Sequence, residues 1–87
     1  MTYILAVVGA ITSATRLAAQ LEKQGCKDVR VIRTPYDIST GGCSYSVRMK
    51  ESCLQQLYSV LNHRRFKAKK IYRVTENDRE CDYDDIS

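Results

Sequence analysis

The stretch that decides the fold opens the chain, where residues 3–8 read YILAVV. These six residues are apolar without alternation, which is typical of a strand that is buried on both faces. Thr12 and Ser13 follow as candidate caps of a helix, and Gly25 is a natural stop for it, because apolar side chains recur between them at helical spacing. The chain therefore begins with a strand and a helix.

The rest of the chain continues this pattern. Residues 29–33, 44–49 and 70–74 predict strands, and residues 54–61 predict a second amphipathic helix. The order β-α-β-β-α-β favours an α+β fold of the ferredoxin-like type, a two-layer sandwich with a four-stranded antiparallel sheet and both helices on one face. The other face of the sheet then contacts water, a ligand or a partner chain. The expected core residues are Ile4, Leu5, Val7, Leu17, Leu21, Val31, Val47, Leu54, Leu57, Leu61 and Ile71.

Composition describes a small globular domain. The chain has 87 residues, of which 44% are hydrophobic and 28% are charged. The longest apolar run, residues 4–11, is far shorter than the ~20 residues of a membrane span, and Gly9 interrupts it. No basic stretch precedes this run, which disfavours a signal peptide. We therefore expect a cytoplasmic protein with no membrane partner.

Charge divides the chain into a basic body and an acidic tail. Residues 1–74 hold 13 Lys and Arg against 4 Asp and Glu, a net charge of +9, whereas residues 75–87 have a net charge of −5. We expect one domain over residues 1–74 and a separate acidic C-terminal tail over residues 75–87. The tail is either a frayed terminus or a segment that folds back on the basic body.

The cysteines do not form a metal-binding pattern. Cys26, Cys43, Cys53 and Cys81 include no Cys-x-x-Cys pair, and His63, expected at the surface, is the single histidine, so we predict no metal and no cofactor. Two disulfides are possible by count, but a chain without a secretory segment favours free thiols. Cys26 fits a turn, and Cys53 fits either a small core residue or a thiol at a helix N-terminus. Acidic neighbours oppose ionisation of Cys81.

The loop with the strongest chemical signal reads TPYDISTGGCSY over residues 34–45. Gly41 and Gly42 allow positive φ and close approach of a ligand, and successive N–H groups in such a turn can form an anion-binding nest. Cys43 follows at once, and these N–H groups, with Arg33 or Arg48 nearby, would lower the pKa of its thiol from about 8.5. The alternative is a Gly-Gly hairpin whose cysteine fills a small buried site. The candidate site residues are the nucleophile Cys43 and the binding residues Thr34, Pro35, Thr40, Gly41, Gly42 and Ser44.

These residues resemble the signature of the selenium/sulfur carrier-like family, a group of small bacterial domains. The resemblance covers about residues 3–74 and rests on the Thr-Pro pair at 34–35 followed by Gly-Gly-Cys at 41–43. It implies that Cys43 carries sulfur or selenium as a persulfide or selenosulfide, and that the protein is a carrier more than an enzyme. It also implies a cysteine desulfurase or a selenium-metabolism enzyme as partner.

Two other classes of function stay open. The protein could be a regulatory or interaction domain that forms a homodimer through its sheet, with an inert Cys43. It could also bind RNA through the basic run at 63–70 and the open sheet face, which would require Tyr3, Tyr45 or Tyr72 on one exposed face. The arginine- or lysine-glycine-aromatic pattern of RNA-recognition strands is absent, which argues against nucleic acid as the partner.

Overall fold

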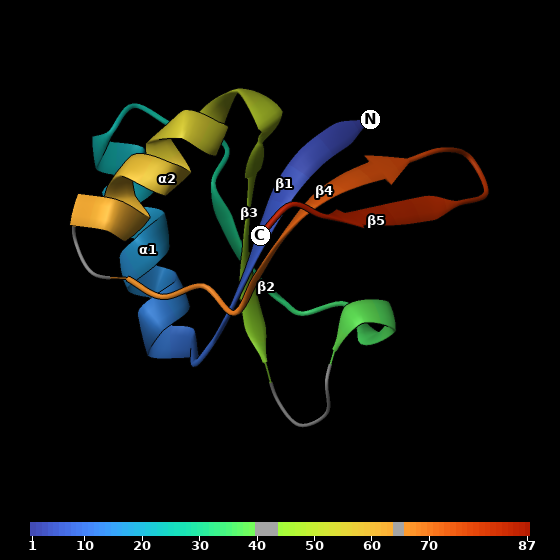
Figure 1. Cartoon of the computed structure of the whole chain (residues 1–87), viewed down its shortest axis with the longest axis horizontal. Coiled ribbons are helices and arrows are strands. Elements are labelled where there is room, and N and C mark those ends of the chain that lie inside the picture. Colours follow the sequence, from blue (N-terminus) through green and yellow to red (C-terminus); the bar gives the residue numbers. More distant parts are fainter. Residues whose placement is uncertain (40–43, 64–65) are drawn as a thin grey trace.

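The computed structural model of the chain describes residues 1–39, 44–63 and 66–87. An antiparallel sheet carries both α-helices on the same face (Figure 1). The elements are β1 (Thr2–Gly9), α1 (Ile11–Lys23), β2 (Arg30–Arg33), the 3-10 helix η1 (Tyr36–Ile38), β3 (Tyr45–Lys50), the 3-10 helix η2 (Glu51–Cys53), α2 (Leu54–His63), β4 (Lys70–Glu76) and β5 (Cys81–Asp85).

The sheet has five strands in the order β2-β3-β1-β4-β5. Strand β1 lies at its centre, between β3 and β4, and both of these neighbours are antiparallel to it. The prediction of an α+β fold with two helices and an antiparallel sheet is confirmed, and the number of four strands was wrong. The ferredoxin-like assignment stays a prediction, because the fifth strand departs from the sheet that we expected.

The fifth strand comes from the acidic tail. Strand β5 pairs with β4 from Tyr72 opposite Asp85 to Glu76 opposite Cys81. The Tyr83 ring packs against the sheet and meets the ring of Tyr72 nearly edge-on, with 6.2 Å between centroids. Of the two interpretations of the tail, folding back on the basic body therefore describes residues 81–85.

Helix α1 begins earlier than the sequence predicted. Gly9 ends β1 at an irregularity in its pairing with β3 and has a φ of +111°. Ala10 is the N-cap and Ile11 the first helical residue, with no side-chain cap hydrogen bond. Thr12 and Ser13, the predicted caps, therefore lie inside the first turn.

The C-terminal end of α1 is a Schellman motif. Gly25, with a φ of +93°, donates its N–H to the carbonyl of Glu22, and Cys26 donates its N–H to the carbonyl of Leu21. Gly25 is thus the predicted stop, because the motif needs the positive φ that glycine adopts without strain. The motif turns Cys26 into the core, where it packs in the same cluster as Leu21.

The core has two parts, one on each face of the sheet. The larger part lies between the sheet and the helices, and the smaller part consists of Tyr3, Leu5 and Val74 on the open face, the face without α-helices. The predicted core residues Ile4, Leu5, Val7, Leu17, Leu21, Val47, Leu57 and Ile71 are buried, and Val31, Leu54 and Leu61 are partly buried against them. The sequence thus identified part of the core, and buried residues such as Met49, Val60 and Val74 were not among those expected.

Candidate functional site

Hydroxyl groups hold the two ends of the β2–β3 loop together. Thr34 donates its N–H to the carbonyl of Ser44 at 2.9 Å, which continues the β2–β3 pairing by one residue past Arg33 and Tyr45. The Thr34 Oγ1 atom also lies 2.9 Å from Ser44 Oγ and 2.7 Å from Ser46 Oγ. Ser46 is fully buried, so this hydroxyl cluster is a fixed base for the loop.

The first part of the loop is also anchored. Pro35 is the N-cap of η1, and its carbonyl accepts the N–H of Ile38 at 3.1 Å. The side chain of Ile38 packs against the apolar cluster on the open face, whereas Tyr36 is 94% exposed. Residues 34–39 therefore lead away from β2 along a path that contacts the open face at Ile38.

The structure brings together two of the predicted site residues, Thr34 and Ser44. Pro35 lies next to them and begins η1. The other four predicted residues, Thr40, Gly41, Gly42 and Cys43, lie outside the described residues.

Two of the described thiols are buried in the core. Cys26 and Cys53 are each 6% exposed, and both belong to the core cluster between the sheet and the helices. Burial, followed by the contact with Cys53, raises the pKa of the Cys26 thiol to about 12. Cys26 is thus a poor nucleophile at neutral pH, because the reactive form of a cysteine is the thiolate. Of the two interpretations of Cys53, the core residue is the one seen.

Cys81 is the exposed thiol among those that the structure describes. It lies on β5 opposite Glu76, at the edge of the sheet. Its thiol, two residues before Tyr83 on the same strand, is the first cause that raises the pKa of the tyrosine, followed by burial.

Arg48, one of the two cations expected beside Cys43, lies elsewhere. The Arg48 guanidinium stacks on the ring of Tyr3, 4.1 Å from its centroid. Four residues of strand separate Arg48 from Ser44, a distance of about 13 Å, so Arg48 belongs to the opposite end of the sheet from the loop. Arg33, the other predicted cation, ends β2 where the loop begins.

Sequence reasoning did not single out Lys69, whose side chain lies against Gly9. Gly9 is paired with Tyr45 at the loop end of β3, and the Lys69 N–H bonds the carbonyl of Val7 at 2.7 Å. A positive charge therefore stands at the loop end of the central strand. The lysine-rich run at 67–70 was the available signal, but only the contacts of Lys69 with Val7 and Gly9 show which lysine lies at this end.

Aromatic side chains are divided between the faces of the sheet. Tyr3 and Tyr72 belong to the open-face cluster, whereas Tyr45 packs against the core on the helix side. Tyr3 is only 8% exposed, and its hydroxyl donates a 2.7 Å hydrogen bond to Glu76. The three tyrosines named for base stacking are therefore not on one exposed face.

The comparisons with known proteins assign the chain to a family. The family model described as "Putative Se/S carrier protein-like" matches residues 3–73. Because this match covers most of the chain, the chain belongs to that family. No curated protein and no solved structure gave a significant match.

Within residues 1–39, 44–63 and 66–87, no helix has the length and apolar character needed to cross a membrane.

Proposed function

We propose that this protein carries sulfur or selenium as a persulfide or selenosulfide on Cys43 and delivers it to an acceptor enzyme. The observation that carries the proposal is the family match over residues 3–73, which includes the Thr-Pro pair at 34–35 and the Gly-Gly-Cys run at 41–43. A carrier of this kind needs a reactive cysteine but no metal and no separate base.

The other three thiols fit this role less well. Cys26 and Cys53 are buried in the core, and a buried thiol cannot meet the active site of a second protein. Cys81 is exposed, but it follows the last residue that the family model matches. Cys43 is the cysteine that remains within the matched part of the chain.

The described ends of the loop support the proposal. The bonds of Thr34 to Ser44 and Ser46 fix the residue that directly follows Cys43 in the chain. Arg33 and Lys69 place positive charge at the same end of the sheet, where it favours an anionic thiolate or persulfide. The strand order β2-β3-β1-β4 fits the ferredoxin-like arrangement, and we include that assignment in the proposal, with β5 as an added edge strand.

The chemistry needs no net oxidation or reduction. The Cys43 thiolate attacks the outer sulfur of a donor persulfide, forming the new S–S bond of a Cys43 persulfide while the donor cysteine leaves as a thiolate. A thiolate of the acceptor then attacks the outer sulfur of Cys43, and Cys43 leaves as a thiolate. Transfer of selenium follows the same balance, and its rate depends on the thiolate fraction and on access to the attacked atom.

The partners follow from this chemistry as part of the proposal. The donor is a cysteine desulfurase or a selenium-metabolism enzyme that presents a persulfide or its selenium equivalent, and the acceptor is an enzyme that uses the chalcogen. We place the protein in the cytoplasm, where reducing conditions keep thiols free.

Alkylation of each cysteine at pH 7, followed by peptide mass spectrometry, tests whether Cys43 is the reactive thiol. We expect Cys43 to react fastest and its apparent pKa to lie below the ~8.5 of an ordinary thiol. Cys81 is the internal control, because it is an exposed thiol outside the proposed site. Equal rates at Cys43 and Cys81 would argue against an activated Cys43.

A further inference from the structure

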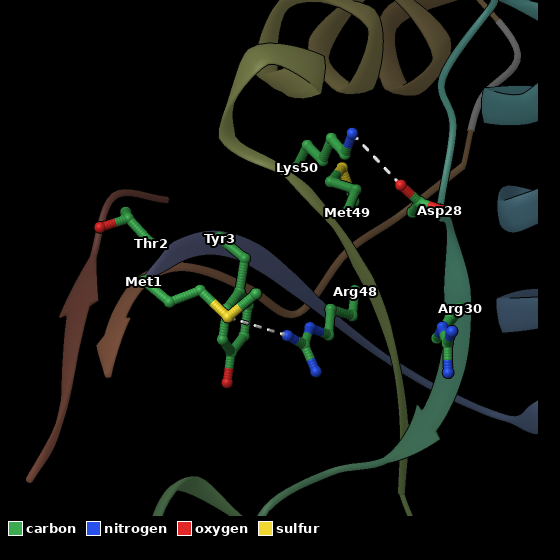
Figure 2. Close-up of a pocket in the computed structure, with 8 residues that line it drawn as sticks. All are labelled: Met1, Thr2, Tyr3, Asp28, Arg30, Arg48, Met49 and Lys50. Carbon is green, nitrogen blue, oxygen red and sulfur yellow. Dashed lines mark hydrogen bonds and ion pairs between the residues drawn. The ribbon is translucent and has the colours of Figure 1, made fainter. Parts of the chain in front are cut away.

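We propose a second site, separate from the cysteine loop, that binds the phosphate group of a small molecule. It is a cleft of about 390 Å³ at the end of the sheet where β1 and β2 begin and β3 ends. Figure 2 shows the residues that line it, and Arg30, Arg48, Tyr3 and Lys50 carry the argument.

Two arginines on neighbouring strands line this cleft. Arg30 on β2 is the direct cross-strand partner of Arg48 on β3, so both side chains project from the same face of the sheet. Like charges at directly opposite positions of a sheet are destabilising. Among the described residues, neither arginine has a carboxylate within ion-pair distance, whereas Lys50 is paired with Asp28 at 3.2 Å. An anion bound in the cleft by both arginines would reduce this repulsion.

The position of Arg48 is fixed before any ligand binds. Its guanidinium lies over the Tyr3 ring, 4.1 Å from the centroid, and one of its nitrogens is 3.7 Å from the Met1 sulfur (Figure 2). Tyr3 is held in turn, because its hydroxyl donates to Glu76. A guanidinium fixed in this way keeps most of its N–H donors for a ligand and loses less freedom on binding.

The size and charge of the cleft select the ligand. Two guanidinium groups match the two negative charges of a phosphate monoester, and each can bond its oxygens through two parallel N–H groups. The volume is at the lower end of the range for small-molecule sites, which leaves room for an organic group beside the phosphate. The exposed Met1 side chain gives that group an apolar surface.

Titration of the full chain with phenyl phosphate, followed through the arginine Nε–H signals by nuclear magnetic resonance, tests the proposal. We expect saturable shifts of Arg30 and Arg48, and weaker binding of inorganic phosphate. Arg30→Gln should weaken phenyl phosphate binding about tenfold, because it removes charge-assisted hydrogen bonds. Arg30 is exposed and its substitution leaves the Arg48–Tyr3 contact in place, so we expect the variant to fold as the wild type does.

Arg16→Gln is the matched control, because it removes the same charge from an exposed position on α1. We expect it to leave binding within about twofold of the wild type. Equal loss in both variants, or no saturable shift at all, would overturn the proposal. Equal binding of benzoate would overturn the assignment to phosphate. Tighter binding of single-stranded RNA with shifts at Tyr72 and Tyr83 would show a nucleic-acid surface instead.

Discussion

At the scale of single residues, folding raises the pKa of two side chains, one on each face of the sheet. The Cys26 thiol lies in the core against Cys53, and burial is the main cause that raises its pKa to about 12. The Tyr3 hydroxyl is buried on the open face, and burial and then its hydrogen bond to Glu76 raise its pKa to about 12 as well. Both groups are neutral when the protein is folded at neutral pH.

These two pKa shifts predict that the protein loses stability at alkaline pH. In the unfolded chain both lose their protons at their ordinary, lower pKa, whereas the folded chain keeps them until about pH 12. The unfolded state therefore binds fewer protons, and the free energy of unfolding falls as the pH rises from about 9 towards 12. Urea denaturation at a series of pH values measures the slope.

Cys26→Ala should flatten that slope, while Cys81→Ser at an exposed position should leave it unchanged. A slope that is the same in Cys26→Ala as in the wild type would show that the buried thiol is not its source.

At the scale of elements, the sequence was most informative where apolar side chains recur regularly. Residues 3–8 were read correctly as the central strand, and Gly25 as the end of the first helix. Strand β5 was missed because only Cys81 and Tyr83 stand among its three aspartates, with no run of apolar side chains. Such a strand forms only because β4 offers a free edge, and its charges suit an edge that must not pair with other chains. Of the candidate site, Thr34 and Ser44 were named from the sequence as binding residues, but their contact was found only in the structure. The distance of Arg48 from the loop depended on a register that the sequence does not reveal.

The Schellman motif predicts a specific cost for one substitution. At Gly25, a Cβ would meet nothing within 4 Å, so Gly25→Ala tests backbone conformation alone. We expect a loss of about 1 kcal/mol in the free energy of unfolding, because an L-residue is strained at positive φ. Gly25→Asn should cost less, since asparagine tolerates this region better. An equal cost for alanine and asparagine, measured in urea, would contradict this explanation.

The contribution of β5 depends on Tyr83. Tyr83→Ala removes the edge-on contact with Tyr72 and the packing on the open face, and it should lower the free energy of unfolding by about 1–3 kcal/mol. Tyr36→Ala, at a 94% exposed position, is the matched control and should change it by less than about 0.5 kcal/mol. Thermal and urea unfolding measure both, and equal effects would mean that β5 adds little to the fold.

At the scale of the whole molecule, the acidic strand partly neutralises a basic sheet. Asp84 is the cross-strand partner of Arg73, and Asp85 is paired with Lys70 at 2.9 Å. The pKa of Asp85 is lowered to about 2, first by the backbone N–H of Ser87 and then by Lys70. The tail is thus part of the charge balance of the domain as well as of its sheet.

Removal of residues 78–87 should therefore increase binding to polyanions. The deletion removes five acids and one arginine, which raises the net charge from +4 to +8. We expect elution from heparin at higher salt, because each added net charge strengthens screened attraction to the polymer. The full-length double variant Asp82→Asn, Asp84→Asn keeps β5 in place and should elute between the two. Identical elution of all three proteins would show that the acids do not screen the basic body.

The central claim is that Cys43 carries the chalcogen, and intact mass spectrometry tests it most directly. We would incubate three proteins, the wild type, Cys43→Ser and Cys81→Ser, with a desulfurase persulfide donor or its selenium equivalent. Their intact masses are then measured without reducing agent. We predict a gain of one sulfur or selenium atom in the wild type and in Cys81→Ser, and no gain in Cys43→Ser. A gain in Cys43→Ser equal to that of the wild type would contradict the claim.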